Sequence, residues 1–149
     1  PVHYIHLENT LGYTHAQNLT LNRPLAFIPA GIMRNTLRFE PNIGRLKDSY
    51  ISAGLDNYFA QNRFDPAFET PTAAYTLIDL SAGTTINIGR QQVKLYVAVN
   101  NLADKKYYDA LSRLKPGRLD QTDPTLGVYN PGRNITFGLN IPFVLTKAN

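Results

Sequence analysis

The segment from Asn134 to Phe143 alternates strictly between apolar residues and small or polar ones. Its apolar members are Ile135, Phe137, Leu139, Ile141 and Phe143. A period of two predicts a β-strand with one apolar face and one polar face. Five earlier segments alternate in the same way, at residues 5–13, 33–40, 50–59, 78–86 and 93–100. Each has roughly the length of 9–11 residues with which a tilted strand crosses a bilayer, and helical spacing fits none of them well.

The composition also favours strands and turns over helices. The 149 residues suffice for one domain but are few for two, and none of them is cysteine, which excludes disulfides and thiolate metal ligands. The net charge of +4 is modest and no dense block of Lys and Arg occurs, so a nucleic-acid partner is not indicated. No apolar run reaches about 18 residues, which excludes a transmembrane helix. Because no signal sequence precedes Pro1, we expect this residue to be internal to a longer protein.

The connections between the six segments alternate in length. Two are short, at residues 41–45 and 87–90, and three are long, at residues 15–31, 62–74 and 101–133. This alternation is expected of an antiparallel up-and-down sheet with turns at one rim and loops at the other. If the last strand ends at the periplasmic side, the three long connections are extracellular.

The two faces of the segments differ in charge. The residues that we expect to face a wide, water-filled or plug-filled lumen are Glu8, Arg34, Arg38, Glu40, Asp56, Asp79 and Lys94. Those that we expect to face lipid are Leu37, Phe39, Ile51, Leu55, Ile78, Leu80, Val93, Leu95, Val97, Val99, Ile135, Phe137, Leu139 and Ile141. Because membrane barrels have at least about eight strands, six strands alone predict an incomplete barrel with two unpaired edges.

Two stretches near the end of the chain, Val97–Lys115 and Gly127–Phe143, closely resemble the C-terminal end of TonB-dependent outer-membrane receptors. The motif residues that carry the resemblance are Asn100, Asn101, Leu102, Asp104, Lys105, Tyr107, Asn130, Pro131, Gly132, Arg133 and Phe143. The likeness extends upstream through residues 8–13, 24–40 and 61–83, and so covers nearly the whole chain. One departure is that residues 144–149 continue past Phe143, where members of the family usually stop.

The resemblance implies an all-β fold in which residues 1–143 supply about six strands of a barrel of about 22 strands. It implies a nutrient receptor of the bacterial outer membrane, with ferric siderophore as the favoured substrate among siderophores, cobalamin, haem and sugars. The implied partners are outer-membrane lipid, the remaining barrel and plug, TonB through a missing N-terminal part, and the barrel assembly machinery through the C-terminal strand. The sequence itself gives no positive evidence of enzymatic activity and indicates no cofactor.

Several residue groups have both a functional and a structural interpretation. The stretch Asn100–Tyr108 could contact a ligand, but we expect its Asn residues to satisfy backbone groups and its Tyr residues to lie at headgroup level. Likewise Arg133 could grip an anion, although guiding the loop into the last strand is the better interpretation. His3 and His6 fall on opposite faces of a strand and cannot chelate one metal as a pair.

The remaining candidates are weaker. His15 at a loop start is expected to be solvated, and the acidic residues Asp104, Asp109, Asp120 and Asp123 lack the spacing of an EF-hand calcium site. No nucleophile motif or located pair of carboxylates indicates catalysis. The alternative to transport is a soluble small β-barrel or sandwich that binds a sugar or lipid with its long loops.

Overall fold

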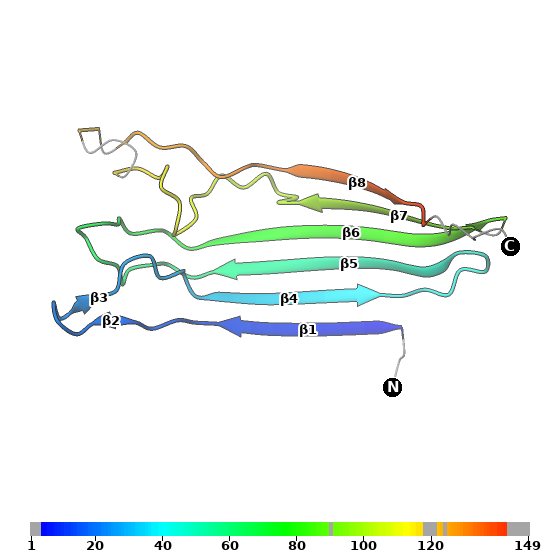
Figure 1. Ribbon diagram of the computed structural model, residues 1–149, viewed down its shortest axis with the longest axis horizontal. Coiled ribbons are helices and arrows are strands. Elements are labelled where there is room, and N and C mark those ends of the chain that lie inside the picture. The colour runs from blue at the N-terminus through cyan, green and yellow to red at the C-terminus, as the bar shows by residue number, and fades with distance from the viewer. Residues whose placement is uncertain (1–3, 90, 118–121, 124, 143–149) are drawn as a thin grey trace, which may run out of the picture.

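The computed structural model describes residues 4–89, 91–117, 122–123 and 125–142. These residues form one six-stranded antiparallel sheet and a small two-stranded hairpin (Figure 1). In spatial order the strands of the sheet are β1 (Ile5–Gly12), β4 (Ile32–Phe39), β5 (Lys47–Tyr58), β6 (Tyr75–Ile88), β7 (Gln91–Asn100) and β8 (Asn134–Asn140). The six segments predicted from alternation are therefore confirmed as strands of an all-β antiparallel sheet. No helix capable of spanning a membrane occurs within the described ranges.

The short and long connections gather at opposite ends of the sheet. In Figure 1 the β4–β5 and β6–β7 turns lie at one end, and the three long connections lie at the other. The alternation predicted from the sequence is confirmed, while the assignment of the long connections to the cell exterior stays a prediction. The sequence did not predict the hairpin of β2 (Gln17–Asn18) and β3 (Arg23–Pro24), because each strand has only two residues.

The β4–β5 turn ends in a local irregularity of the sheet. Gly44 has a φ of 49°, which glycine adopts without steric cost. The register then shifts between Lys47 and Tyr50, where Asp48 has a φ of 48°. The extra residue forms a β-bulge, and it re-aims the side chains that follow.

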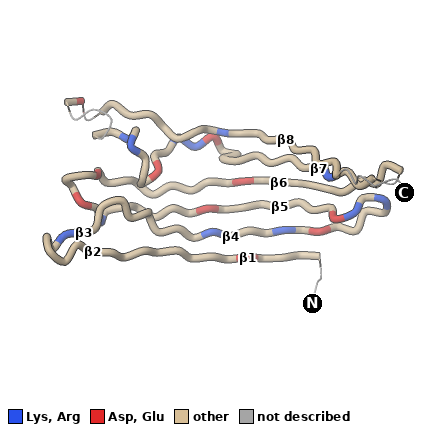
Figure 2. Tube along the Cα trace, viewed as in Figure 1, with Lys and Arg blue, Asp and Glu red and all other residues tan. Residues whose placement is uncertain are grey.

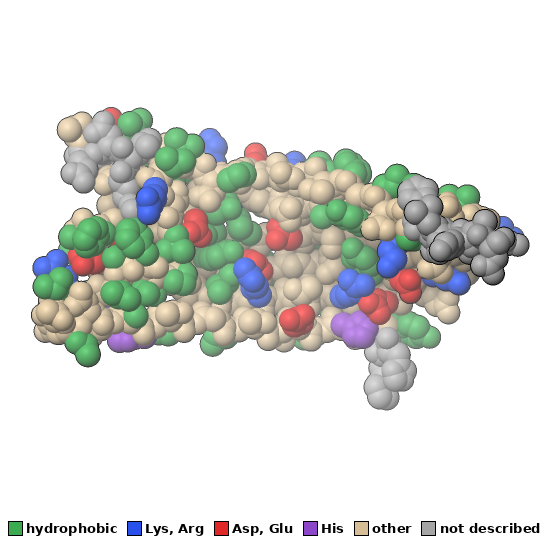
Figure 3. Space-filling model, in the orientation of Figure 1, with side chains coloured by type: hydrophobic (Ala, Val, Ile, Leu, Met, Phe, Trp, Pro, Cys, Tyr) green, Lys and Arg blue, Asp and Glu red, His purple; other side chains and the backbone are tan. Residues whose placement is uncertain are grey.

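The strand register extends the two faces across all six strands. One row of paired residues runs Leu7, Leu37, Ala53, Leu80, Val99 and Ile135, and a parallel row runs Ile5, Phe39, Ile51, Ala82, Val97 and Phe137. We call this side the apolar face and the opposite side the polar face. Figure 2 shows basic residues on β4 and acidic residues on β5 and β6, and Figure 3 shows charged side chains over the middle of the polar face.

The sheet is a single layer with almost no packed core. The buried apolar residues among those described are Tyr75, Val93 and Ala110. In contrast, Leu7 is 66 % exposed, Leu139 62 % and Phe137 78 %. A continuous apolar surface of this kind marks contact with a membrane or with another protein surface rather than with water.

On the polar face, two tyrosine rings lie flat against glycines of the next strand. Tyr50 on β5 covers Gly83 on β6, because a Cβ atom at Gly83 would lie 2.5 Å from Tyr50 Cε1. Tyr96 on β7 covers Gly138 on β8 so closely that a Cβ atom there would overlap the ring. The Arg38 guanidinium lies 3.8 Å above the Tyr50 ring centroid and completes this layer with a cation–π contact.

Candidate functional site

The predicted lumen-facing residues all lie on the polar face. Arg34 donates from Nε to Asp56 Oδ2 at 3.1 Å, directly across the β4–β5 pair. Glu40, which follows β4, accepts from Arg38 Nε at 2.6 Å and lies 3.3 Å from His6 Nε2. Glu8, Asp79 and Lys94 share this face by register. Contact of this face with a lumen stays a prediction.

The predicted lipid-facing residues share the apolar face, apart from Ile141, which follows β8. They are Leu37, Phe39, Ile51, Leu55, Ile78, Leu80, Val93, Leu95, Val97, Val99, Ile135, Phe137 and Leu139. Val93 differs from the others because it is only 6 % exposed, so the chain itself covers it. Contact of this face with lipid likewise stays a prediction. Phe143, residues 144–149 and His3 lie outside the described residues.

The Asn-Asn-Leu turn after β7 is built by hydrogen bonds between side chains and backbone. Asn100 is the last residue of β7 and pairs with Asn134. Asn101 is 3 % exposed and has a φ of 51°. Its Nδ2 donates to Lys105 O at 2.9 Å, and its Oδ1 accepts from Lys105 N at 2.8 Å. Asp79 Oδ1 accepts from Asn101 N at 2.8 Å, so one predicted lumen-facing carboxylate anchors this turn.

The second half of the family motif returns to the same turn. Arg133 N donates to Asp104 Oδ1 at 2.8 Å, and Arg133 Nε donates to Leu102 O at 2.9 Å. A side chain at Gly132 would collide with the Asp104 carboxylate. Asn130 N donates to Tyr107 O at 3.0 Å. These contacts give the motif a structural role, in which Arg133 holds the loop at the entry to β8.

Side-chain donors that bind backbone carbonyls join the three long connections to one another. Gln61 Nε2 donates to Ile28 O at 2.7 Å, and Arg63 Nη1 donates to Ala16 O at 2.5 Å. These bonds tie the β5–β6 connection to the β1–β4 connection. The Arg23 Nη1 atom adds an ion pair with Asp65 Oδ1 at 3.6 Å.

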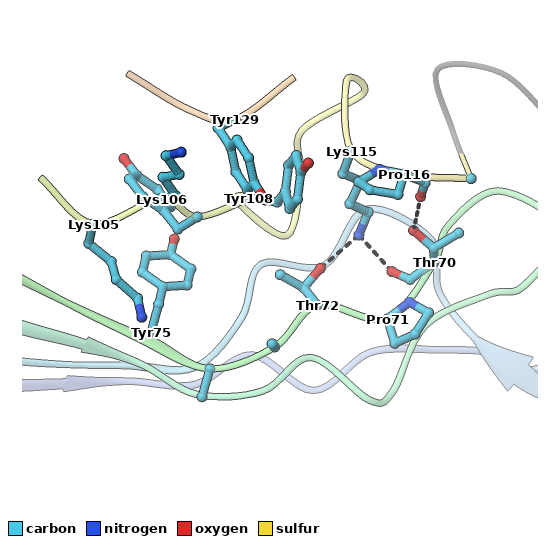
Figure 4. Close-up of a pocket in the computed structure, with 14 residues that line it drawn as sticks. Thr70, Pro71, Thr72, Tyr75, Lys105, Lys106, Tyr108, Lys115, Pro116 and Tyr129 are labelled. Carbon is cyan, nitrogen blue, oxygen red and sulfur yellow. Dashed lines mark hydrogen bonds between the residues drawn. The ribbon is translucent and has the colours of Figure 1, made fainter. Parts of the chain in front are cut away.

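A buried lysine ties the β5–β6 connection to the β7–β8 connection. Lys115 is 2 % exposed, and its Nζ donates to Thr70 O at 2.6 Å, Thr72 Oγ1 at 2.8 Å and Ala110 O at 3.0 Å. Figure 4 shows its ammonium pointing from one connection to the other. Three acceptors satisfy the three donors of the ammonium group, as burial of a cation requires.

Tyrosine rings continue this contact toward the sheet. The Tyr75 ring stacks between Tyr58 and Tyr107, with both centroid distances at 4.5 Å, and its hydroxyl donates to Asp109 Oδ2 at 3.3 Å. Burial raises the pKa of Tyr107 above its ordinary value, because desolvation disfavours the charged phenolate. Tyr108 and Tyr129 form a second stacked pair at 4.4 Å.

A pocket of about 500 Å³ lies between these two connections (Figure 4). Its lining residues are Thr70–Tyr75, Lys105–Tyr108, Lys115–Gly117 and Tyr129. Tyrosine faces can pack against a planar or sugar ring, and the exposed ammonium groups of Lys105 and Lys106 can bind an anion. We call this the tyrosine pocket. Its aromatic faces and exposed ammonium groups suit a small anionic ligand.

Other predicted ligand groups are not brought together in this way. No group of three or more His, Cys, Asp or Glu side chains is placed to hold a metal ion among the described residues. Asp104 and Asp109 instead accept hydrogen bonds from the loop backbone. The sequence did not single out Tyr75 or Lys115. The Lys-Pro-Gly sequence at residues 115–117 marks a turn, but nothing local reveals the burial of its lysine.

One comparison relates this geometry to a known protein. The chain matches a solved chain described as the copper transporter OprC, with a TM-score of 0.73 and 22 % sequence identity. The match covers 90 % of this chain and 20 % of that chain. The fold is that of an antiparallel up-and-down β-barrel segment. This barrel segment therefore spans about one fifth of the length of the solved chain it matches. No family model matches the sequence, and no curated protein matches it either.

Proposed function

We propose that this barrel segment is the C-terminal part of a TonB-dependent receptor of the bacterial outer membrane. The observation that carries the proposal is the single-layer sheet with one continuous apolar face and one charged face, in a fold shared with a transporter. The apolar face would contact acyl chains, and the charged face would line a lumen that holds the plug. Strands outside this chain would pair with the free edges of β1 and β8.

The proposed activity is uptake of a scarce nutrient, with ferric siderophore as the favoured substrate and energy supplied through TonB. The tyrosine pocket supports a role in first contact with an anionic ligand, because it lies at the end of the sheet where the long connections are. The alternative of a soluble sugar- or lipid-binding module is disfavoured, since a soluble sheet would cover Leu7, Phe137 and Leu139.

The membrane part of the proposal is tested by placing arginine on each face. Leu95 and Leu139 face each other across β7 and β8 on the apolar face. Leu139→Arg should destabilise the inserted protein by about 2–4 kcal/mol if the position lies near mid-bilayer. The matched control is Thr136→Arg, whose position shares the polar face with Ala98 and should tolerate the charge. Equal folding yields of both variants in lipid vesicles would contradict the face assignment.

The transport part is tested by uptake into cells that express the full-length protein. Radioactive iron supplied as a ferric siderophore should accumulate under iron limitation, and dissipation of the proton gradient should stop it. Copper serves as the second arm, because the matched solved protein is described as a copper transporter. Accumulation of copper without iron would reject the siderophore assignment and keep the transport proposal, whereas accumulation of neither would reject both.

A further inference from the structure

A separate pocket of about 510 Å³ lies between the β1–β4 and β5–β6 connections, next to Gly117. Its described lining residues are Phe27, Pro66, Ala67, Phe68, Glu69, Thr70 and Gly117. Among them, Glu69 is the one that carries a charge. We call this the Glu69 pocket. It shares Thr70 and Gly117 with the tyrosine pocket and is otherwise distinct from it.

The carboxylate of Glu69 is buried, and only one of its two oxygens accepts a hydrogen bond from the described part of the chain. The residue is 4 % exposed, and its Oε2 accepts from Phe27 N at 2.9 Å. Its other oxygen, Oε1, has no hydrogen-bond donor or cation partner among the described residues. Buried polar atoms are nearly always paired, and an unpaired oxygen of a buried carboxylate is costly.

A neighbouring carboxylate shows how an arginine balances the charge of a buried acid in this connection. Asp65 is also 4 % exposed. Its Oδ1 accepts from Ala67 N at 3.0 Å and lies 3.6 Å from Arg23 Nη1, so an arginine balances its charge. Glu69 lies four residues later and has no such cation among the described residues. The contrast indicates that the missing partner of Glu69 comes from outside these residues.

Aromatic rings at the same pocket favour a positive charge. The rings of Phe27 and Phe68 lie 6.4 Å apart at an angle of 46°, and the Arg113 guanidinium lies 5.9 Å from the Phe27 centroid. The negative faces of such rings attract cations. Phe27 has a φ of 62°, which is unusual for a large residue, and its N–H bond to Glu69 holds that conformation beside the pocket.

We propose that the Glu69 pocket binds the primary ammonium group of a small organic cation. The ammonium donates a hydrogen bond to Glu69 Oε1, and the Phe68 ring covers the adjoining methylene groups. A charge-assisted bond of this kind is stronger than a neutral one and requires an N–H donor, so quaternary cations bind more weakly.

The test is a titration of the full-length protein in detergent with butylammonium chloride, followed by calorimetry. Glu69→Gln keeps an acceptor for Phe27 N but removes the charge, and it should raise the Kd at least about 10-fold. Glu40→Gln is the matched control, because Glu40 is an acid outside the pocket, and its Kd should stay at the wild-type value. Phe68→Leu, at a residue that is 57 % exposed, should preserve the fold and raise the Kd by about 3-fold.

Three results would overturn the proposal. They are no binding of butylammonium to the wild-type protein, an unchanged Kd in Glu69→Gln, or equally tight binding of tetramethylammonium, which has no N–H donor. The titration needs neither TonB nor a membrane, so its result is independent of the transport proposal.

Discussion

Replacing Gly138 by alanine should destabilise the sheet, because the Tyr96 ring occupies the space of the added methyl group. Tyr96 is 46 % exposed, so about half of the 150–250 Å² of a buried aromatic side chain is covered here. At about 25 cal/mol per Å², about 100 Å² of covered ring contributes about 2.5 kcal/mol, which bounds the cost of displacing it. Replacing glycine by alanine also restricts the unfolded chain, which restores about 0.4–1 kcal/mol. We therefore expect a net loss of about 1–2 kcal/mol.

Gly54 provides a matched control on the same face. A Cβ atom at Gly54 would lie 3.7 Å from Asp79 Cβ, an ordinary van der Waals distance. Gly54→Ala should therefore be neutral or stabilise the sheet by up to about 1 kcal/mol. The measurement is guanidinium unfolding of the full-length protein in detergent micelles, followed by far-ultraviolet circular dichroism.

A second variant separates the ring contact from any backbone effect. In a Tyr96→Ala background the overlap is absent, so Gly138→Ala should lose its cost and behave like Gly54→Ala. If Gly138→Ala costs the same with and without the Tyr96 ring, the ring does not lie against β8, and the reasoning is refuted.

Three further perturbations test the loops and the polar face. Lys115→Met should lower the free energy of unfolding by about 1–3 kcal/mol and speed proteolysis within residues 59–74, because Thr70 O and Ala110 O lose their donor. Lys106→Met should change neither the free energy of unfolding nor the rate of proteolysis. Asn101→Ala should cost about 1–3 kcal/mol in denaturant unfolding, whereas equal stability of the two proteins would contradict the bonds to Lys105. The hydrogen bond from Arg38 lowers the pKa of Glu40. The stabilisation of the folded state by Glu40 is therefore fully present above the ordinary glutamate pKa, and it is lost as the pH falls through the lowered pKa. Glu40→Gln should remove this part of the acid dependence in a pH titration of unfolding.

The strands and their faces could be predicted because successive side chains of a strand point to opposite faces of the sheet. In a single-layer sheet, every second residue points to the same side, so Leu37 and Arg38 are assigned to faces without knowledge of any partner strand. The terminal motif was predictable for a similar reason, since Asn101 and Gly132 are residue types that tight turns require.

The loop pockets could not be predicted because their contacts join distant parts of the chain. Lys115 bonds to residues 43 and 45 positions earlier, and Glu69 bonds to a residue 42 positions earlier. No local pattern encodes such pairings. The bulge at Asp48 was missed as well, because nothing in alternating hydrophobicity marks one extra residue at the start of a strand.

The bonds between the long connections have a consequence for how this surface can evolve. Gln61, Arg63 and Lys115 each donate to a main-chain carbonyl, at Ile28, Ala16 and Thr70 respectively. Every amino acid supplies such a carbonyl, so mutations at the acceptor positions leave the bonds intact. The outward side chains of these connections can therefore diversify while three donor residues preserve the arrangement of the connections.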